Sequence, residues 1–342
     1  MPEKNGLPMK LFRLFIVFSL ALAPYACNTA WAGPFDFEDP LPFSFGGYSS
    51  AGFQIHPGGD KEARLHQYSV IVNWDNKDRL HLFGEFELEN PLSWEEGGAP
   101  PNTGEARLDV ERLYADYALN SRANLRGGRF LTPIGRWNVI HAAPLVWTTT
   151  RPGATERLFP MSINGAMLHG AVPWGDNALE YSAYAELLRD QSHDENEIDF
   201  SNARGLRLNY TGAFEVGVNL SEFEENENLL GDPRYRMLGV DFVKAWNGWE
   251  ISAEVYQRDR RDEGGSTGGG YLQTVVPLGN QWYAIARLEN LREEERGTTG
   301  RWLVGAAWRY TTDRVIKLEY VGGRDEHPDM PRGFIASFAI LF

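Results

Sequence analysis

The groups that could do chemistry in this chain are charged side chains that occur singly, not in a compact motif. Three of them, Arg136, His141 and Arg151, lie in a segment, 132–163, that is otherwise rich in apolar residues. Fixed charges that face one another across a narrow aqueous space act on passing ions by Coulomb attraction and by replacing their hydration. Hydrolysis would instead need a nucleophile beside a base, or paired carboxylates beside a histidine.

The histidines do not form such a hydrolytic site. His66 and His81 flank one predicted hairpin near its opposite ends, which at about 3.3 Å per residue places them roughly 25 Å apart. The others are spread along the chain, and the sequence contains neither a nucleophile elbow nor zinc-ligand spacing. We therefore expect no catalytic residue, no metal and no cofactor. A barrel lipase or protease is the least favoured alternative.

The elements that must position these charges are β-strands. In the last eleven residues, every second position is apolar: Phe334, Ala336, Phe338, Ile340 and Phe342. A period of two places these side chains on one face of a strand. The strand ends on an aromatic residue, which resembles the sorting signal of bacterial outer-membrane barrels. A buried terminal strand of a soluble sandwich is the alternative for this segment alone.

Similar alternation recurs along the chain and predicts sixteen strands, near 43–55, 64–74, 79–89, 107–119, 123–131, 163–173, 178–188, 202–210, 213–223, 235–245, 248–257, 269–277, 280–290, 300–310, 314–322 and 332–342. Every second connection is short and turn-like. The others are longer and charged: 56–63, 90–106, 132–162, 189–201, 224–234, 258–268, 291–299 and 323–331. An even strand number with this asymmetry predicts an all-β fold, an antiparallel transmembrane β-barrel.

The strand pattern also sorts side chains between the two faces. Near 213–223, Phe214, Val216, Val218 and Leu220 are expected to face lipid, and Glu215 and Asn219 the interior. Polar inward positions predict a water-filled interior rather than a packed core. Tryptophans near strand ends are expected to form interfacial belts: Trp74, Trp174, Trp246, Trp249 and Trp282.

The N-terminus has the layout of a secretory signal peptide. Lys4, Lys10 and Arg13 precede an apolar run, 14–26, that is too short to span a membrane, and Ala30-Trp31-Ala32 offers a cleavage site. We expect residues 1–32 to be the signal peptide, 33–42 a short lead-in and 43–342 the barrel. A lipoprotein anchored at Cys27, the only cysteine, is the alternative, but the residues before it form a poor lipobox.

The predicted mature chain is strongly acidic. Removing three basic residues and one acidic residue with the signal peptide leaves 30 basic and 46 acidic residues, a net charge of −16. This balance argues against nucleic acid as a partner. Four lysines remain, Lys61, Lys77, Lys244 and Lys317.

The longest connection, 132–162, is too apolar for an exposed loop and should pack against the barrel interior. We therefore expect Arg136, His141 and Arg151 at a pore constriction. The predicted pore lining is mixed in charge: Arg112, Asp116, Arg126, Glu180, Glu186, Arg207, Glu215, Glu250, Glu254, Arg287 and Arg309, with Glu85, Glu87, Asp241, Glu289 and Lys317 as further inward positions. For the first three, the alternative is a structural ion pair or loop cap.

One segment resembles a known family. Gly128-Arg129-Phe130-Leu131-Thr132-Pro133-Ile134-Gly135, followed by Trp137-Asn138 and Pro144-Leu145-Val146-Trp147, is similar to the strand-to-loop segment of the phosphate-selective porin O/P group. The resemblance implies a sixteen-stranded barrel, usually a homotrimer, whose third loop folds inward as the constriction. Phosphate-selective members use a ladder of arginines and a lysine cluster. This chain has few lysines, so phosphate selectivity is not carried over.

Together these observations predict an outer-membrane porin for passive diffusion of small hydrophilic solutes or ions, in contact with membrane lipid and lipopolysaccharide. The acidic long connections are interpreted as solvated surface, with divalent-cation bridging to lipopolysaccharide as an alternative. A plugged or structural barrel that binds a partner protein is the main competing function. Whether the pore prefers cations or anions is left open.

Overall fold

The computed structural model describes residues 42–98, 100–189, 198–226, 231–261, 264–294, 296–324 and 330–342. It contains sixteen strands: β1 Phe43–Ile55, β2 Lys61–Asp75, β3 Leu80–Glu95, β4 Arg107–Asn120, β5 Ala123–Leu131, β6 Ser162–Trp174, β7 Asn177–Leu188, β8 Phe200–Thr211, β9 Glu215–Glu225, β10 Arg234–Trp246, β11 Trp249–Arg260, β12 Ser266–Gly279, β13 Trp282–Glu293, β14 Gly297–Trp308, β15 Arg314–Gly323 and β16 Gly333–Leu341. The predicted number and placement of the strands are confirmed. The predicted signal peptide lies outside the described residues.

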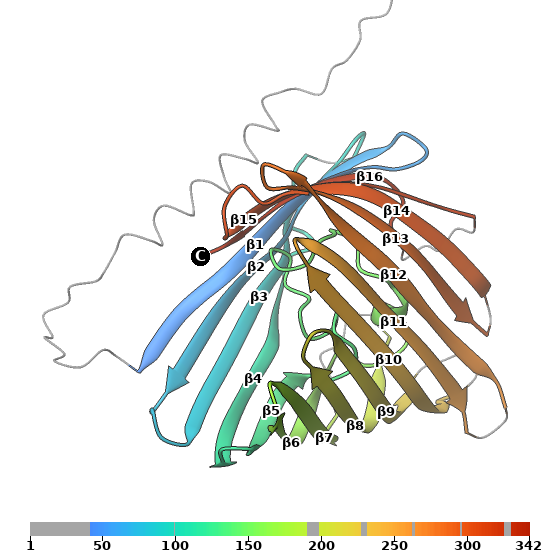
Figure 1. Cartoon of the computed structure of the whole chain (residues 1–342). Helices are drawn as coiled ribbons and strands as arrows, with labels where there is room; N and C mark the ends of the chain where they lie inside the picture. The colour runs from blue at the N-terminus through green and yellow to red at the C-terminus, as the bar shows by residue number, and fades with distance from the viewer. Residues whose placement is uncertain are drawn as a thin grey trace, which may run out of the picture.

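The strands form one closed antiparallel barrel (Figure 1). Each strand pairs with its neighbours in sequence, and β1 closes the ring by pairing with β16 from Tyr48↔Leu341 to Ile55↔Phe334. Closure gives every strand two partners, so the backbone polar groups are satisfied without an exposed edge. The C-terminal segment therefore acts as the closing strand.

The predicted connections need one correction. Several segments expected to be long loops are strand instead. β3 continues to Glu95, and its last part still pairs with β2 at Leu65↔Leu92 and Glu62↔Glu95. The connection from Glu293 to Gly297 is shorter than the one from Trp308 to Arg314, so the alternation of loop lengths is not strict. A strand can continue through charged residues where it extends beyond the membrane into water. Water solvates their side chains there, and the backbone hydrogen bonds to the neighbouring strand remain intact.

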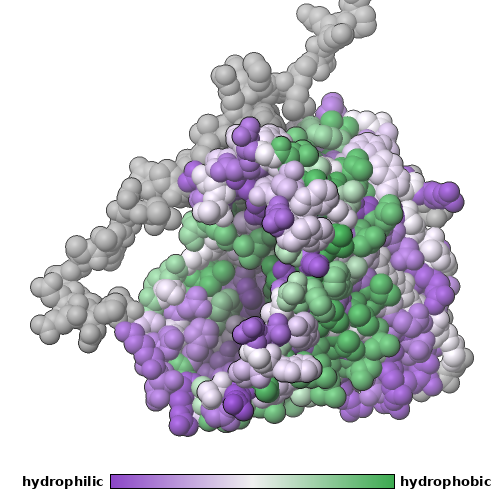
Figure 2. All heavy atoms as spheres, viewed as in Figure 1, coloured by the Kyte–Doolittle hydropathy of each residue, from purple (hydrophilic) through white to green (hydrophobic). Residues whose placement is uncertain are grey.

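The outward face is apolar, as the two-residue period predicts. Val218 and Leu220 on β9 are exposed, whereas the alternating residues Asn219 and Ser221 are buried. The same alternation holds on β14, where Val304 is exposed and Leu303 is buried. Figure 2 shows hydrophobic residues gathered over a broad area of the outer surface, with hydrophilic residues along its lower edge.

Aromatic residues gather at the end of the barrel that carries the short turns. Trp246 and Trp249 stack across the β10–β11 turn with ring centroids 6.2 Å apart, and Trp282 stacks on Trp308 at 5.5 Å. Trp174, at the end of β6, meets a tyrosine of β8 edge to face. Amphipathic rings at one level of a barrel fit an interfacial belt.

The inward face is mixed rather than uniformly polar, which corrects the expectation from the sequence. One cluster of buried apolar side chains includes Met167, Tyr184 and Met237 from the wall. A second includes Val275 and Ile285 with neighbours on β14 to β16. These inward residues are apolar because a chain segment packs on them inside the barrel. Among the described residues, no helix is long and apolar enough to span a membrane.

Candidate functional site

The segment between β5 and β6, residues 132–161, is here named the third loop. Its trace lies inside the ring of strands (Figure 1), and it contains one short helix, α2, Gly153–Arg157. Ile134, Leu158 and Phe159 of the loop are fully buried in the first apolar cluster. Trp147 packs on Tyr283 of β13 at 4.9 Å between ring centroids. The sequence-based expectation that this apolar loop packs against the interior is therefore what the structure shows.

Three buried wall carboxylates accept backbone N–H groups of the third loop. Glu254 accepts from Trp137 at 2.7 Å and from Arg136 at 3.2 Å. Glu319 accepts from residues 149 and 150 at 3.1 and 2.9 Å, and Glu289 accepts from residue 153 at 2.8 Å. Ionised acceptors make stronger hydrogen bonds than neutral ones, so these contacts fix the loop to β11, β13 and β15.

Wall cations bind the same loop through its carbonyl and hydroxyl oxygens. Arg287 donates to the Thr148 and Thr150 side chains, at 2.8 Å each, and to the Thr150 carbonyl at 2.9 Å. Lys317 donates to the carbonyls of residues 143 and 148, at 2.7 and 3.1 Å. Arg309 donates to the carbonyls of residues 144 and 145, at 2.9 and 3.1 Å. Arg309 follows β14 at the short-turn end, so the loop reaches deep into the barrel.

The loop therefore covers part of the wall that the sequence assigned to the pore lining. Arg287 and Glu254 are each 1% exposed, Lys317 is 2% exposed and Glu289 is 8% exposed. They point inward, as predicted, but each forms hydrogen bonds to the third loop. The sequence could not distinguish an inward position under the loop from one that faces open lumen.

The side chain of Arg151 donates its hydrogen bonds within the third loop. Its guanidinium donates to Asn138 Oδ1 at 2.9 Å, to the Thr155 carbonyl at 2.7 Å and to Met161 Sδ at 2.8 Å. Burial lowers the pKa of Arg151 below its usual range. These contacts join the two ends of the loop to its middle, so Arg151 holds the fold of the loop together.

Arg136 and His141 reach from the loop to other strands. Arg136 Nη1 lies 2.6 Å from Glu215 Oε2 on β9, and both side chains are about one third exposed. His141 Nε2 lies 3.4 Å from Glu111 Oε1 on β4, and its Nδ1 is 3.1 Å from the Asn138 carbonyl. Burial, together with Arg151 and Arg112, lowers the pKa of His141 to about 4. The imidazole is therefore neutral at pH 7. Through these two residues the loop contacts two separate parts of the wall, β9 and β4.

The remaining predicted lining residues lie on the wall of β3 to β11. Arg112 pairs with Glu85, Arg126 with Asp116 and Arg207 with Asp241. Glu87 accepts hydrogen bonds from Tyr48 and Ser69, and Glu186 accepts from the backbone N–H of residue 203. Glu180 accepts from Asn209 and Thr211. Glu250 shares the inward face of β11 with the buried Ser252 and Glu254.

Sequence reasoning missed the space between the third loop and the wall of β1, β2 and β16. A cavity of about 230 Å³ lies there, lined from the wall by Glu62, Arg64 and His66 and from the loop by Thr149 and Glu156. The missing signal is a register irregularity: β2 shifts between Leu65 and Gln67, which turns His66 toward the interior. Strict alternation cannot locate such a bulge.

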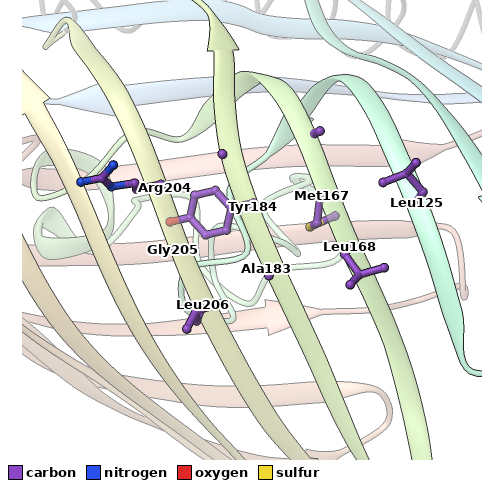
Figure 3. Close-up of a pocket in the computed structure, with 10 residues that line it drawn as sticks. Leu125, Met167, Leu168, Ala183, Tyr184, Arg204, Gly205 and Leu206 are labelled. Carbon is purple, nitrogen blue, oxygen red and sulfur yellow. The ribbon is translucent and has the colours of Figure 1, made fainter.

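A second hollow lies on the outer face of the barrel (Figure 3). It has a volume of about 510 Å³ and spans β5 to β8, where Leu125, Leu168 and Leu206 surround Ala166 and Ala183. An open apolar groove on the face that meets lipid is not a solute pathway. Among the described residues, no group of three or more His, Cys, Asp or Glu side chains is placed to hold a metal ion.

Comparisons with solved structures place this fold among porins. The chain matches OmpTdeltaL8, a loop-deletion mutant of the Vibrio cholerae outer membrane protein OmpT, with TM-score 0.61 and 12% identity, over 88% of this chain and 99% of that one. It matches the anion-selective porin from Comamonas acidovorans with TM-score 0.59 and 12% identity, over 87% and 98%. It matches Salmonella typhi OmpF with TM-score 0.60 and 12% identity, over 90% and 98%. At these identities the likeness establishes the fold, a sixteen-stranded porin barrel.

Sequence comparison adds little beyond the fold. No family model matches the chain. An uncharacterized protein of Aquifex aeolicus is 30% identical over 176 residues, which are 50% of this chain. The chain spans only 38% of the length of that relative.

Proposed function

We propose that the protein is an outer-membrane porin, a water-filled channel through which small hydrophilic solutes or ions diffuse passively. The observation that carries this proposal is the third loop held inside a closed sixteen-stranded barrel. The barrel presents an apolar outer face to lipid and ion-paired polar side chains to its interior. Such a molecule needs no reaction to act, because the lumen itself is the pathway.

The constriction would lie where the third loop approaches the uncovered wall. Arg136 with Glu215, and His141 with Glu111, are contacts of this kind between loop and wall, and both carry charge or can acquire it. Arg151 would contribute by holding the shape of the loop. Glu62, Arg64 and Glu156 around the 230 Å³ cavity extend the proposed lining.

The cellular setting is proposed on the same basis. A porin barrel belongs in the bacterial outer membrane, and the N-terminal sequence offers a signal peptide for export. One solved form of the Vibrio cholerae protein is described as a trimer, which supports a homotrimer here. The segment from Gly128 to Trp147 supports placement in the phosphate-selective porin O/P group, without its phosphate selectivity.

A plugged barrel that binds a partner protein is the second candidate. The two apolar clusters inside the barrel favour it, because they fill part of the lumen with packed side chains. The two functions differ in a direct observable, since a plugged barrel conducts no ions.

Single-channel recording of the refolded protein in a planar bilayer tests the proposal. We expect steady ohmic steps and a reversal potential, under a salt gradient, that changes in Arg136→Ala. Arg204→Ala is the matched control, because this arginine lies on the outer face with its side chain 62% exposed. Absence of conductance from verified folded barrel would refute the porin and favour the plugged barrel.

A further inference from the structure

The charges of the lower lumen, the part near the short turns, are not balanced. Three arginines there each bind one carboxylate. Arg126 holds Asp116 through two hydrogen bonds of 2.8 and 2.7 Å. Arg207 holds Asp241 through two bonds of 2.7 and 2.8 Å. Each arginine and its bound carboxylate together carry almost no net charge, so the pair acts only weakly on a passing ion.

The third arginine belongs to the loop. Arg136 binds Glu215 at 2.6 Å, near the start of β9. Arg309, at the same end of the barrel, is engaged by two carbonyl oxygens of the third loop. Its positive charge lies close enough to Glu250 for an electrostatic interaction, but without an ion-pair contact.

Glu180 on β7 is an acid of this region with only neutral partners. Its carboxylate accepts hydrogen bonds from the amide of Asn209 at 3.0 Å and the hydroxyl of Thr211 at 3.4 Å. The residue is exposed, and it lies on the same face of β7 as the inward Tyr184. Within the described part of the chain, no arginine or lysine forms an ion pair with Glu180.

Glu250 on β11 is the second such acid. It occupies the inward face of β11 four residues before Glu254. Glu254 is buried and accepts hydrogen bonds from the backbone of the third loop. Glu250 is half-buried and lies nearer the short-turn end of β11. No ion pair to Glu250 is formed by the cations of the described residues, so its charge offsets Arg309 from a distance.

We infer that the channel prefers cations, and that Glu180 and Glu250 are specificity-determining residues at its short-turn mouth. The inference rests on the proposed function, because selectivity has meaning only in a conducting barrel. In water, a unit charge about 6 Å from an ion changes the local concentration of that ion roughly threefold. Because Glu250 offsets Arg309 from a distance, Glu180 leaves one uncompensated negative charge among these groups. That charge attracts small cations such as potassium or alkylammonium ions and repels chloride.

The test is the reversal potential of the full refolded chain in a bilayer between about 0.1 M KCl on one side and about 0.3 M KCl on the other. At these concentrations the Debye length is about 10 Å or less. We expect a potassium-to-chloride permeability ratio above about 2. Glu180→Gln with Glu250→Gln should lower that ratio about twofold or more. Asp176→Asn is the matched control, because it removes one carboxylate at the exposed tip of the β6–β7 turn, and it should leave the ratio almost unchanged.

A second measurement needs no variant. The ratio of the unmodified channel should fall toward 1 in about 1 M KCl, where the Debye length shrinks to about 3 Å. Conductance with a ratio at or below 1, or a double variant with the ratio of the unmodified channel, would overturn the inference and leave the porin standing. No conductance at all would remove the proposed function as well.

Discussion

Replacing Arg287 with methionine tests whether the wall holds the third loop in place. Arg287 is 1% exposed and makes three hydrogen bonds to the loop, at 2.8, 2.9 and 2.8 Å. It also binds Glu289 at 3.2 Å. Methionine keeps much of the volume but none of the donors, so Arg287→Met leaves the loop oxygens and part of the Glu289 carboxylate without their partner.

The magnitude follows from the burial of this network. Removing one partner of a buried, hydrogen-bonded charge pair costs about 3–5 kcal/mol. Because the barrel ladder itself does not use the Arg287 side chain, most of that cost should fall on the equilibrium between the seated and detached loop. At about 1.4 kcal/mol per factor of ten, detachment should become at least a hundredfold more frequent.

Two assays report on the detached loop. Single-channel records of Arg287→Met should show a larger and fluctuating conductance, because the loop no longer narrows the lumen at a fixed position. Trypsin added to the folded barrel should cleave after Arg136 or Arg157 much faster than in the unmodified protein. Arg204→Met is the control, since that arginine pairs with Glu222 on the outer face and should leave both readouts unchanged.

The reasoning is refuted if folded Arg287→Met conducts in steady steps of the original size and resists trypsin as well as the unmodified protein. A milder variant covers the case in which methionine prevents folding. Thr150→Val removes one of the three acceptors, Thr150 Oγ1, while keeping the wall charges intact. It should produce the same changes to a smaller extent.

Three further predictions concern the loop itself. Burial, with Arg151 and Arg112, lowers the pKa of His141 to about 4, while Glu85 opposes the shift. The seated loop should therefore be fully stable above about pH 6.5 and lose up to about 3 kcal/mol toward pH 4. Single-channel records against pH should show this loss in the unmodified protein and not in His141→Gln. Arg151→Ala should give heterogeneous conductance. Arg151→Lys should not restore uniform conductance, because lysine lacks the planar fork that bridges several acceptors. Uniform conductance of Arg151→Lys would contradict this prediction. Gly135→Ala should destabilise the seated loop by at least about 1 kcal/mol. Gly135 has φ +65°, and an added Cβ would meet the Tyr256 hydroxyl and the Glu254 carboxylate. Unchanged conductance of this variant would count against the prediction.

The barrel could be predicted from the sequence because its determinants are local. Alternation with a period of two places Val218 and Leu220 outside and Asn219 inside, whatever the neighbouring strands do. Turn residues mark the hairpins in the same local manner. Positions where the register shifts, such as His66 on β2, break the period and could not be located, because a bulge depends on pairing with the neighbouring strand.

The third loop was predictable as a packed segment but not in its contacts. Its apolar content indicates burial, and it is buried. Which wall it packs against depends on matches between side chains far apart in sequence, such as Glu319 with residues 149 and 150. The function of Arg151 within the loop was not visible for the same reason, since its partners are set by how the loop folds back on itself.

The charge of the inner wall and the charge of the pore are therefore different quantities in this protein. The third loop covers Arg287, Lys317 and Glu254, and their hydrogen bonds to its backbone and side chains remove them from the surface that an ion meets. What an ion meets instead are bound pairs such as Arg126 with Asp116, and acids such as Glu180 that have neutral partners. Selectivity in such a barrel depends on the wall residues that the loop leaves uncovered. A substitution under the loop should alter conductance by moving the loop, whereas one on the open wall should alter ion preference at constant conductance.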